Sequence, residues 1–410
     1  MRILQINAVY EKFSTGRNTK ELHEAMKKKG IESFVACTDT ASLSSENAYK
    51  IGNKLDWKLH ALFSRITGKQ GYFSHITTQG LLKYISEIKP DVIHLGNLHS
   101  NYINLPMLLE YIAENDIATV LTLHDCWFYT GKCMYYIEYN CERWKKHCGS
   151  CPALRTGNPS FFWDKTEKML TDKENLFRAI NRLAVIGVSQ WVTNDAAKSI
   201  LKNSTMIQCI YNWIDLDCFQ PKDCKEFKRS MGMESKFVIL GIAMSWIPQK
   251  GSNIFYELAD ILPNDCQIIL IGDISKVKKM NSKIKYLGTI KDVDILAKFY
   301  AMADVFVNPT IQETFGKTTA EAMACGTPVI AYNGTATPEL VGSDGCCGFL
   351  VDENCARNYY EKILKIKEQG KTTFGRAARM RAEKLFSKDK NIEMYCDVYE
   401  KLLNERSVKK

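Results

Sequence analysis

Short runs of apolar, β-branched residues recur along the whole chain, and each is followed by a stretch long enough for one helix. The runs cover residues 2–6, 34–36, 92–95, 119–123, 184–188 and 206–210, and then 237–242, 268–271, 284–287, 305–307 and 328–331. Strands that alternate with helices are joined by right-handed crossovers and form parallel sheets. Two such series within 410 residues predict an α/β protein with two doubly wound domains.

A proline and a charged run separate the two series near residues 219–228. We therefore expect a first domain over residues 1–221, with a cysteine-rich insertion at 126–152, and a second domain over 222–387. The C-terminal segment 388–410 contains a predicted helix at 391–403, which we expect to return to the first domain.

The composition is that of an ordinary globular protein, with 45% hydrophobic and 25% charged residues and no low-complexity tract. No apolar stretch approaches the roughly 18 residues of a membrane-spanning helix, and the first residues lack the features of a signal peptide. We expect a soluble cytoplasmic protein whose fifteen cysteines are mostly reduced. The net charge of +9 suits anionic partners such as nucleotide diphosphates or lipid headgroups, and nucleic acid is not required.

The most specific local pattern is NPTIQETFGKTTAEAMACGTP, at residues 308–328, which predicts a strand end, a loop, a helix and the next strand. Gly326 is placed to end the helix. The helix start around Gly316 offers unpaired N–H groups and the positive end of the dipole, and glycine lets an anion approach the backbone, so the segment predicts a phosphate site. Glu313 and Glu321 bracket this site; singly, each could equally be a loop or helix-face charge.

Glu313 and Glu321 are separated by seven residues, with Phe-Gly after the first and EAMACGTPV at the second. This string resembles the signature of family-four retaining glycosyltransferases, including those that build capsular polysaccharide, exopolysaccharide or O-antigen, and the similarity extends over nearly the whole chain. The resemblance implies the GT-B fold, in which two Rossmann-like domains face a central cleft. It also implies metal-independent transfer from a UDP- or GDP-linked sugar, with configuration retained.

The resemblance assigns roles to this second-domain segment. Glu313 would be a catalytic residue in contact with the donor sugar, and Glu321 would hold the ribose. The donor-binding set would further contain Thr314, Phe315, Gly316, Lys317 and Thr318.

Lys250, after the run at 237–242, matches the family lysine that neutralises the diphosphate, although alone it could be a surface lysine at a helix start. The family usually adds an arginine just before it, but residues 243–246 read Ala-Met-Ser-Trp. Arg17 or Lys317 are the candidates to replace that arginine.

Two segments of the first domain also match. The residues at 14–17, including Gly16 and Arg17, resemble the glycine-containing loop that faces the donor phosphates. His124 and Asp125 end a predicted strand and are similar to the segment whose histidine reaches the transferred sugar. A hydrogen-bonded structural histidine is the alternative for His124, but its position at a strand end favours a role in the site.

An insertion after Asp125 contains four cysteines within nineteen residues, Cys133, Cys141, Cys148 and Cys151. Four thiolates can close a tetrahedral zinc site and stiffen a loop that has no core of its own. Reduced cysteines packed among aromatic residues are the alternative, because the first two spacings are looser than those of paired zinc knuckles.

The stretch 55–73 mixes basic, aromatic and aliphatic residues and predicts a basic amphipathic helix. Such a helix can lie at an anionic membrane surface, or it can pack on the first domain as ordinary structure.

Two Asp-x-Asp pairs, at 215–217 and 292–294, superficially resemble a metal-binding motif, but a turn and a helix cap explain them better. The leading interpretation is a hexosyltransferase acting on a lipid-linked or other glycan acceptor in polysaccharide biosynthesis. The alternatives are a nucleotide-sugar epimerase or phosphorylase of related architecture, and a nonenzymatic nucleotide-sugar-binding protein, for which the missing arginine is the support.

Overall fold

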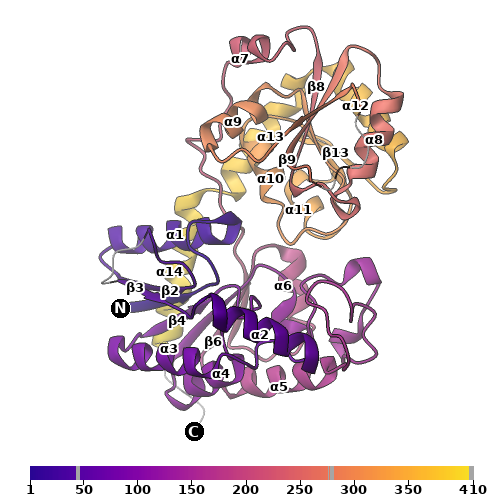
Figure 1. The fold of residues 1–410 in the computed structure, drawn as a ribbon. Helices are drawn as coiled ribbons and strands as arrows, with labels where there is room; N and C mark the ends of the chain where they lie inside the picture. Colours follow the sequence, from indigo (N-terminus) through magenta and orange to yellow (C-terminus); the bar gives the residue numbers. More distant parts are fainter. Residues whose placement is uncertain (43–46, 276, 278–280, 406–410) are drawn as a thin grey trace. The chain divides into compact units, whose positions relative to one another are not determined.

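The computed structural model describes residues 1–42, 47–275, 277 and 281–405, which form two compact units (Figure 1). The first unit comprises Met1–Ile210 and Ile392–Lys410, and the second comprises Tyr211–Asn391. Each unit is a parallel β-sheet whose strands are connected mainly by helices. The predicted α/β fold with two doubly wound parallel sheets is therefore confirmed.

The described residues of the first unit form a seven-stranded parallel sheet in the order β3-β2-β1-β4-β5-β6-β7. Its strands are β1 (Arg2–Ile6), β2 (Glu32–Cys37), β3 (Ala48–Lys50), β4 (Val92–Leu95), β5 (Ala118–Leu123), β6 (Leu183–Gly187) and β7 (Met206–Cys209). Its helices are α1 (Phe13–Lys28), α2 (Lys54–Thr67), α3 (His75–Ile88), α4 (Leu105–Glu114), α5 (Thr166–Ala179) and α6 (Gln190–Ala196). The chain returns to this unit at Ile392, within α14 (Lys388–Asn404).

The described residues of the second unit form a six-stranded parallel sheet in the order β10-β9-β8-β11-β12-β13. Its strands are β8 (Phe237–Ser245), β9 (Cys266–Asp273), β10 (Ile284–Leu287), β11 (Val305–Asn308), β12 (Val329–Tyr332) and β13 (Gly348–Val351). Its helices are α7 (Lys225–Ser230), α8 (Ser252–Ile261), α9 (Val293–Met302), α10 (Lys317–Ala324), α11 (Thr337–Val341), α12 (Ala356–Gln369) and α13 (Lys371–Leu385). No helix in the described ranges is long and apolar enough to cross a membrane.

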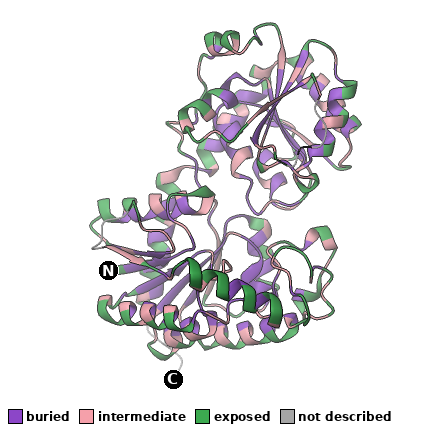
Figure 2. Cartoon of the chain, in the orientation of Figure 1, coloured by how far each residue is buried: buried purple, intermediate pink, exposed green. Residues whose placement is uncertain are grey.

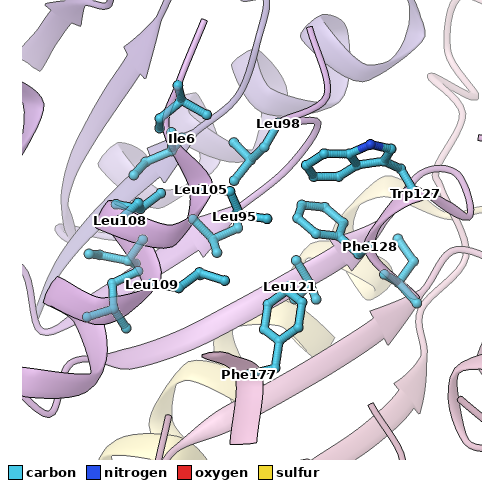
Figure 3. Close-up of a cluster of buried hydrophobic side chains, with 14 of the residues drawn as sticks. Ile6, Leu95, Leu98, Leu105, Leu108, Leu109, Leu121, Trp127, Phe128 and Phe177 are labelled. Carbon is cyan, nitrogen blue, oxygen red and sulfur yellow. The ribbon is translucent and has the colours of Figure 1, made fainter. Parts of the chain in front are cut away.

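The central strands of the first unit, β1, β4, β5 and β6, are buried almost throughout because helices cover them, and their residues are mainly apolar. Figure 3 shows aliphatic side chains of β1, β4, β5 and α4 packed together, with aromatic side chains that follow β5 beside them. Trp127 and Phe128 lie in this core although they begin the cysteine-rich insertion, and Phe128 packs edge-on against Phe177 of α5 at a centroid distance of 6.1 Å. The start of the insertion is thus anchored in the core of the unit.

All eleven predicted strands are present, with their ends shifted by up to three residues. β3 and β13 were not predicted, because they are short and lack a continuous buried apolar run. The amphipathic helix was expected to reach residue 73, whereas α2 ends at Thr67. Gly68 takes the left-handed conformation that stops the helix, with φ of 75°.

In the second unit, Gly251 brings the turn after β8 against the loop after β11. Its φ is +77°, and a Cβ atom placed there would lie 2.1 Å from Cγ of Pro309. Only glycine accepts both the left-handed backbone and this contact. The two loops are therefore held together by backbone packing.

In the first unit, α14 reaches the centre of the sheet through His94 of β4. The Nδ1 atom of His94 lies 2.7 Å from the hydroxyl of Tyr399, and Nε2 lies 2.7 Å from Oγ1 of Thr122. The Thr122 hydroxyl also contacts the hydroxyl of Tyr395 at 3.1 Å. Burial, assisted by the nearby charge of His124, lowers the pKa of His94 to about 3.

Gly251→Ala should destabilise the second unit more than Gly232→Ala. Both glycines have positive φ, 77° and 71°, so alanine costs roughly 1–2 kcal/mol at either position. Nothing lies within 4 Å of a Cβ at Gly232, whereas at Gly251 the clash with Pro309 should add about 1–3 kcal/mol. Urea denaturation followed by circular dichroism measures the difference, and equal losses in the two variants would show that the contact with Pro309 is unimportant.

Acidification should destabilise the first unit through His94. An unfolded histidine takes up a proton below pH 6.5, but the folded residue does so only near pH 3, so the folded state loses free energy as the pH falls through this window. Between pH 7 and pH 5 the expected loss from His94 is about 1–2 kcal/mol. His94→Gln keeps hydrogen-bonding groups without a titrating ring, and its unfolding free energy should change less over this range. The same pH dependence in both proteins would contradict the assignment.

Candidate functional site

The order of strands in the second unit reverses between β8 and β11, which lie side by side at the centre of the sheet. In open parallel sheets, ligands bind beyond the carboxyl ends of the strands at such a reversal. Lys250 follows β8, and the loop that contains Glu313 follows β11. The topology therefore brings together the two segments that the sequence analysis had selected separately.

Lys250 and Glu313 form an ion pair. The Nζ atom of Lys250 lies 2.9 Å from Oε1 of Glu313, and their side chains are 33% and 18% exposed. The packing of Gly251 on Pro309 holds the two loops at this spacing. Asn354 supports the second loop by donating a hydrogen bond from Nδ2 to the carbonyl oxygen of Pro309 at 3.0 Å.

The backbone of Glu313 is held by the loop that follows β12. Its N–H donates to Oγ1 of Thr335 at 3.0 Å, and its carbonyl oxygen accepts from the N–H of Ala336 at 3.3 Å. Thr335 has a φ of 51°, so this loop also adopts a locally unfavourable backbone. Glu313 is consequently held both by its own loop and by the loop after β12.

The amino end of α10 follows directly. Gly316 is the N-cap, with φ of 91°, and its carbonyl oxygen accepts from the N–H of Ala320. Thr314 and Phe315 are buried, while Lys317 and Thr318 are half-buried. Phe315 packs edge-on against Phe386 at a centroid distance of 5.4 Å. The first N–H groups of a helix have no acceptor within it, so this end suits an anionic ligand.

Glu321 is buried, with only 2% of its surface exposed, so it is not the solvated helix-face charge that was the alternative interpretation. Its Oε2 atom accepts a hydrogen bond from the hydroxyl of Tyr300 at 2.9 Å. Tyr300 lies on α9, and its carbonyl oxygen accepts from the hydroxyl of Thr327 at 2.6 Å. A buried carboxylate needs such partners to offset its desolvation.

Residues 243–246, where the family usually has an arginine, carry no positive charge. Met244 is 76% exposed, and the indole N–H of Trp246 donates to the carbonyl oxygen of Ile271 at 3.2 Å. Within this unit, Lys317 at the first position of α10 is the predicted replacement that lies on the same helix end as Gly316.

The first unit has a second group of polar side chains at the carboxyl ends of β4 and β5. Nε2 of His99 lies 2.8 Å from Oδ2 of Asp125, and Oδ1 of Asp125 accepts from the N–H of Trp127 at 2.9 Å. Burial alone would raise the pKa of Asp125, but the charge and hydrogen bond of His99 and the Trp127 N–H outweigh it and lower the pKa. Burial likewise opposes protonation of His99, yet Asp125 raises the pKa of that ring.

His99 was missed in the sequence analysis, although the rule that selected His124 also applies to it, because it follows β4. His124 itself is half-buried, and its charge contributes to the lowered pKa of Asp125. The structure therefore brings His99, His124 and Asp125 together at one edge of this sheet.

One expected loop is wrong. Residues 14–17, with Gly16 and Arg17, lie in the first turn of α1, and the loop after β1 ends before them. Positive φ angles at Glu11 and Phe13, 63° and 59°, turn the chain into the helix early. Gly16 is buried where a Cβ atom would lie 3.1 Å from the backbone nitrogen of Glu11, and Arg17 is half-buried.

Four cysteines of the insertion line one small cavity, and all four are free thiols. They are Cys133, Cys141, Cys148 and Cys151. In the described parts of the chain, no three or more His, Cys, Asp or Glu side chains are arranged to hold a metal ion. Zinc binding therefore stays a prediction. The two Asp-x-Asp pairs are explained as expected: Asp215 accepts from the N–H groups of a turn, and Asp292 caps α9.

Two family models match the chain. The model described as "Glycosyltransferase Family 4" matches residues 15–218, and that described as "Glycosyl transferases group 1" matches residues 235–369. The chain is 25% identical over 232 residues to N-acetyl-alpha-D-glucosaminyl L-malate synthase of Bacillus anthracis, covering 54% of this chain and 60% of the relative. It is 25% identical over 329 residues to the colanic acid biosynthesis glycosyl transferase WcaC of Escherichia coli K12, covering 76% and 77%.

Among solved structures, HepE of Anabaena in complex with UDP superposes with a TM-score of 0.68 at 18% identity, over 98% of this chain and 100% of that one. A likeness at this identity shows the fold. The two family models lie one on each unit and between them match most of the chain. The chain therefore belongs to glycosyltransferase family four and has the GT-B fold of that family.

Proposed function

We propose that this chain transfers a hexose or related sugar from a UDP- or GDP-linked donor to a glycan acceptor, with retention of configuration and without a metal ion. The observation that carries the proposal is the Lys250–Glu313 ion pair beside the amino end of α10. Transfer with retention and without a metal is the rule in this family. HepE, which has the same fold, was solved with bound UDP.

The diphosphate of the donor is assigned to the amino end of α10. The N–H groups near Gly316 and the dipole of the helix favour negative charge there. Lys250 supplies the mobile cation, and Lys317 is the proposed substitute for the missing arginine. When a diphosphate binds, the Lys250 ammonium can turn to it from Glu313, which frees Glu313 to accept a hydrogen bond from a sugar hydroxyl.

The remaining assignments follow from the family resemblance. Glu321 would hold the ribose, and Thr314, Phe315 and Thr318 would complete the donor site. In the first unit, His124 would contact the transferred sugar, and Asp125, held by His99 and the Trp127 N–H, would belong to the donor-binding set. Gly16 and Arg17 remain proposed donor contacts, now at a helix start.

The proposed reaction is a displacement at the anomeric carbon. The bond from that carbon to the phosphate oxygen breaks, the acceptor oxygen bonds on the same face, and its proton passes to the leaving phosphate oxygen. Negative charge therefore grows on the diphosphate. The α10 amides, and Lys250 once it has turned from Glu313, would act on this growing charge, so they would stabilise the transition state more than the ground state.

A surface of the first unit favours an acceptor linked to lipid at a membrane. The apolar face comprises exposed side chains of α2 together with an aromatic turn that precedes α5: Leu55, Trp57, Leu59, Leu62, Phe63, Ile66, Phe161, Phe162 and Trp163. Figure 2 shows α2 as a largely exposed helix. The turn is joined to α2 by a hydrogen bond from the Phe161 N–H to the carbonyl oxygen of Arg65 at 2.7 Å. Exposed apolar residues gathered in this way mark an interaction site.

Basic residues accompany the apolar face, namely Lys54, Lys58, Arg65, Lys69 and Lys165. The ammonium of Lys165 lies 5.8 Å from the centroid of the Trp163 ring. Basic side chains beside aromatic and aliphatic ones suit an interface with anionic lipid headgroups. We therefore propose peripheral contact of this face with an anionic membrane and a lipid-linked acceptor in polysaccharide biosynthesis.

Removing either member of the ion pair should reduce transfer. Lys250→Met and Glu313→Gln should each lower kcat/KM by about 100- to 1000-fold, since each removes a group that acts on the transition state. Release of nucleoside diphosphate, measured over a panel of UDP- and GDP-sugars, gives the rate. Lys225→Met and Glu368→Gln, which change exposed residues of α7 and α12, serve as matched controls. Full activity in both site variants would refute the assignment, and donor binding without any release would favour the nonenzymatic alternative.

The protein should bind through its apolar face to vesicles of phosphatidylcholine and phosphatidylglycerol and sediment with them. A Trp57→Ser/Phe63→Ser/Trp163→Ser variant should lose this binding, whereas Met380→Ser, which removes an exposed apolar residue of α13, should keep it. Lys58→Gln/Arg65→Gln should weaken binding by about 10- to 30-fold, because each basic residue near an anionic surface contributes about 1 kcal/mol. If the wild type does not sediment, or if the triple variant binds equally well, the membrane proposal is wrong and the donor site is unaffected.

A further inference from the structure

The insertion between β5 and α5 is held together by side chains, since its described residues contain little regular structure. Single 3₁₀ turns at Trp127–Tyr129, Ile137–Tyr139 and Arg143–Lys145 are its helical elements. Three buried aromatic rings pack at its centre, with Trp144 lying 5.1 Å from both Tyr129 and Tyr136 between ring centroids. A bound metal ion can add a constraint to a segment of this kind.

Four thiols from different parts of the insertion line one cavity beside these rings. The thiols of Cys133 and Cys151 are hydrogen-bonded to each other, and Cys148 lies near both Cys141 and Cys151. All four are free of disulfides. Residues eighteen positions apart in the sequence are therefore brought to one point by the fold.

The sulfur atoms at the two ends of the turn from Cys148 to Cys151 are hydrogen-bonded to backbone groups outside the turn. Gly131 donates its N–H to Sγ of Cys148 at 3.4 Å, and the backbone of Ala153 is hydrogen-bonded to the Cys151 thiol. Backbone donors of this kind stabilise negative charge on sulfur, which is the form that binds metal.

Arg143 closes the same turn from outside. Its Nη1 atom donates to the carbonyl oxygens of Gly149 and Ser150 at 2.5 and 2.7 Å. Both residues have positive φ, 126° and 44°, so the turn is tight.

Two buried lysines face the cysteines. Lys173 of α5 is 2% exposed and donates from Nζ to the carbonyl oxygens of Trp127 and Thr130 at 2.6 and 3.0 Å. Lys132 is 5% exposed and donates to the carbonyl oxygens of Ala153 and Leu154 at 3.1 and 2.8 Å. For both ammonium groups, the hydrogen bonds among the described residues go to carbonyl oxygens.

The ionisable neighbours of these ammonium groups are chiefly thiols. Negative charge on Cys148, Cys133 or Asp125 favours the protonated form of Lys173. Negative charge on Cys151, Cys133 or Asp164 does the same for Lys132. Burying a charge is costly unless an opposite charge accompanies it. Thiolates at these cysteines would place that opposite charge beside the two buried lysine side chains.

We propose that Cys133, Cys141, Cys148 and Cys151 bind one zinc ion as thiolates, and that Lys132 and Lys173 balance the charge of the cluster. Binding releases four thiol protons to solvent, and four thiolates around one Zn²⁺ leave a double negative charge. The four thiols share one cavity but, as described, they are not arranged to hold a metal ion, so the proposal requires their side chains to reorient when zinc binds.

The zinc site would stiffen the chain on both sides of the insertion. The N–H of Cys151 donates to Oδ2 of Asp164 at 2.7 Å, and Asp164 also caps the start of α5 through Thr166. Lys173 holds the carbonyl oxygen of Trp127, whose N–H binds Asp125. The ion is thus a structural element that fixes the loop after β5 and takes no part in the transfer itself.

The direct test is the metal content of the wild-type protein purified without chelator. Elemental analysis should give about one zinc per chain, and a mercurial thiol reagent should release it as four thiols react. Substitution by Co²⁺ should give the visible bands of a tetrahedral tetrathiolate site. Absence of zinc, or disulfides among these four cysteines in the purified protein, would overturn the proposal without any variant being needed.

Variants locate the site. Cys148→Ser/Cys151→Ser should lose the zinc, whereas Cys346→Ser, which changes an exposed cysteine of the second unit, should keep it. Lys173→Met should lower zinc affinity by roughly tenfold or more, as loss of an outer partner of a metal site does. Lys168→Met, on the same helix but with its side chain 54% exposed, is the matched control. Unchanged zinc affinity in Lys173→Met would contradict the charge-balance role.

Discussion

The reversal of strand order between β8 and β11 is the constraint on which the donor site depends, because it opens a place for ligands at the centre of the sheet. The contact of Gly251 with Pro309 then fixes the two loops at that place. Lys250 meets Glu313 there, beside the capped start of α10. The cation, the carboxylate and the helix end are all consequences of one topological feature.

The first unit repeats this logic with different chemistry. Its sheet has the same central order, and His99, His124 and Asp125 follow β4 and β5, whereas the lysine and glutamate of the second unit follow β8 and β11. Behind this edge, His94 is held by two tyrosines of α14, so the C-terminal helix supports the strand that leads to His99. The unit also carries the cysteine cluster, which suits the anchoring of a loop. Its apolar face suits contact with a membrane.

Much of this could be predicted from the sequence because it depends on local patterns. The apolar runs located eleven strands, and the glycine that caps α10 follows from the motif at 308–328. What the sequence did not show depends on long-range packing. Buried Glu321 has its hydrogen-bond partner, Tyr300, on the preceding helix, and Lys250 and Glu313 pair across two loops that touch at Gly251 and Pro309. The early start of α1 results from positive φ angles at Glu11 and Phe13, residues that rarely adopt them.

The most direct test is a crystal structure of the chain with a bound nucleoside diphosphate. The account predicts that the terminal phosphate contacts backbone N–H groups at the start of α10 near Gly316, and that the Lys250 ammonium has moved from Glu313 to a phosphate oxygen. A nucleotide bound elsewhere, with the Lys250–Glu313 pair intact and the start of α10 without a ligand, would contradict it.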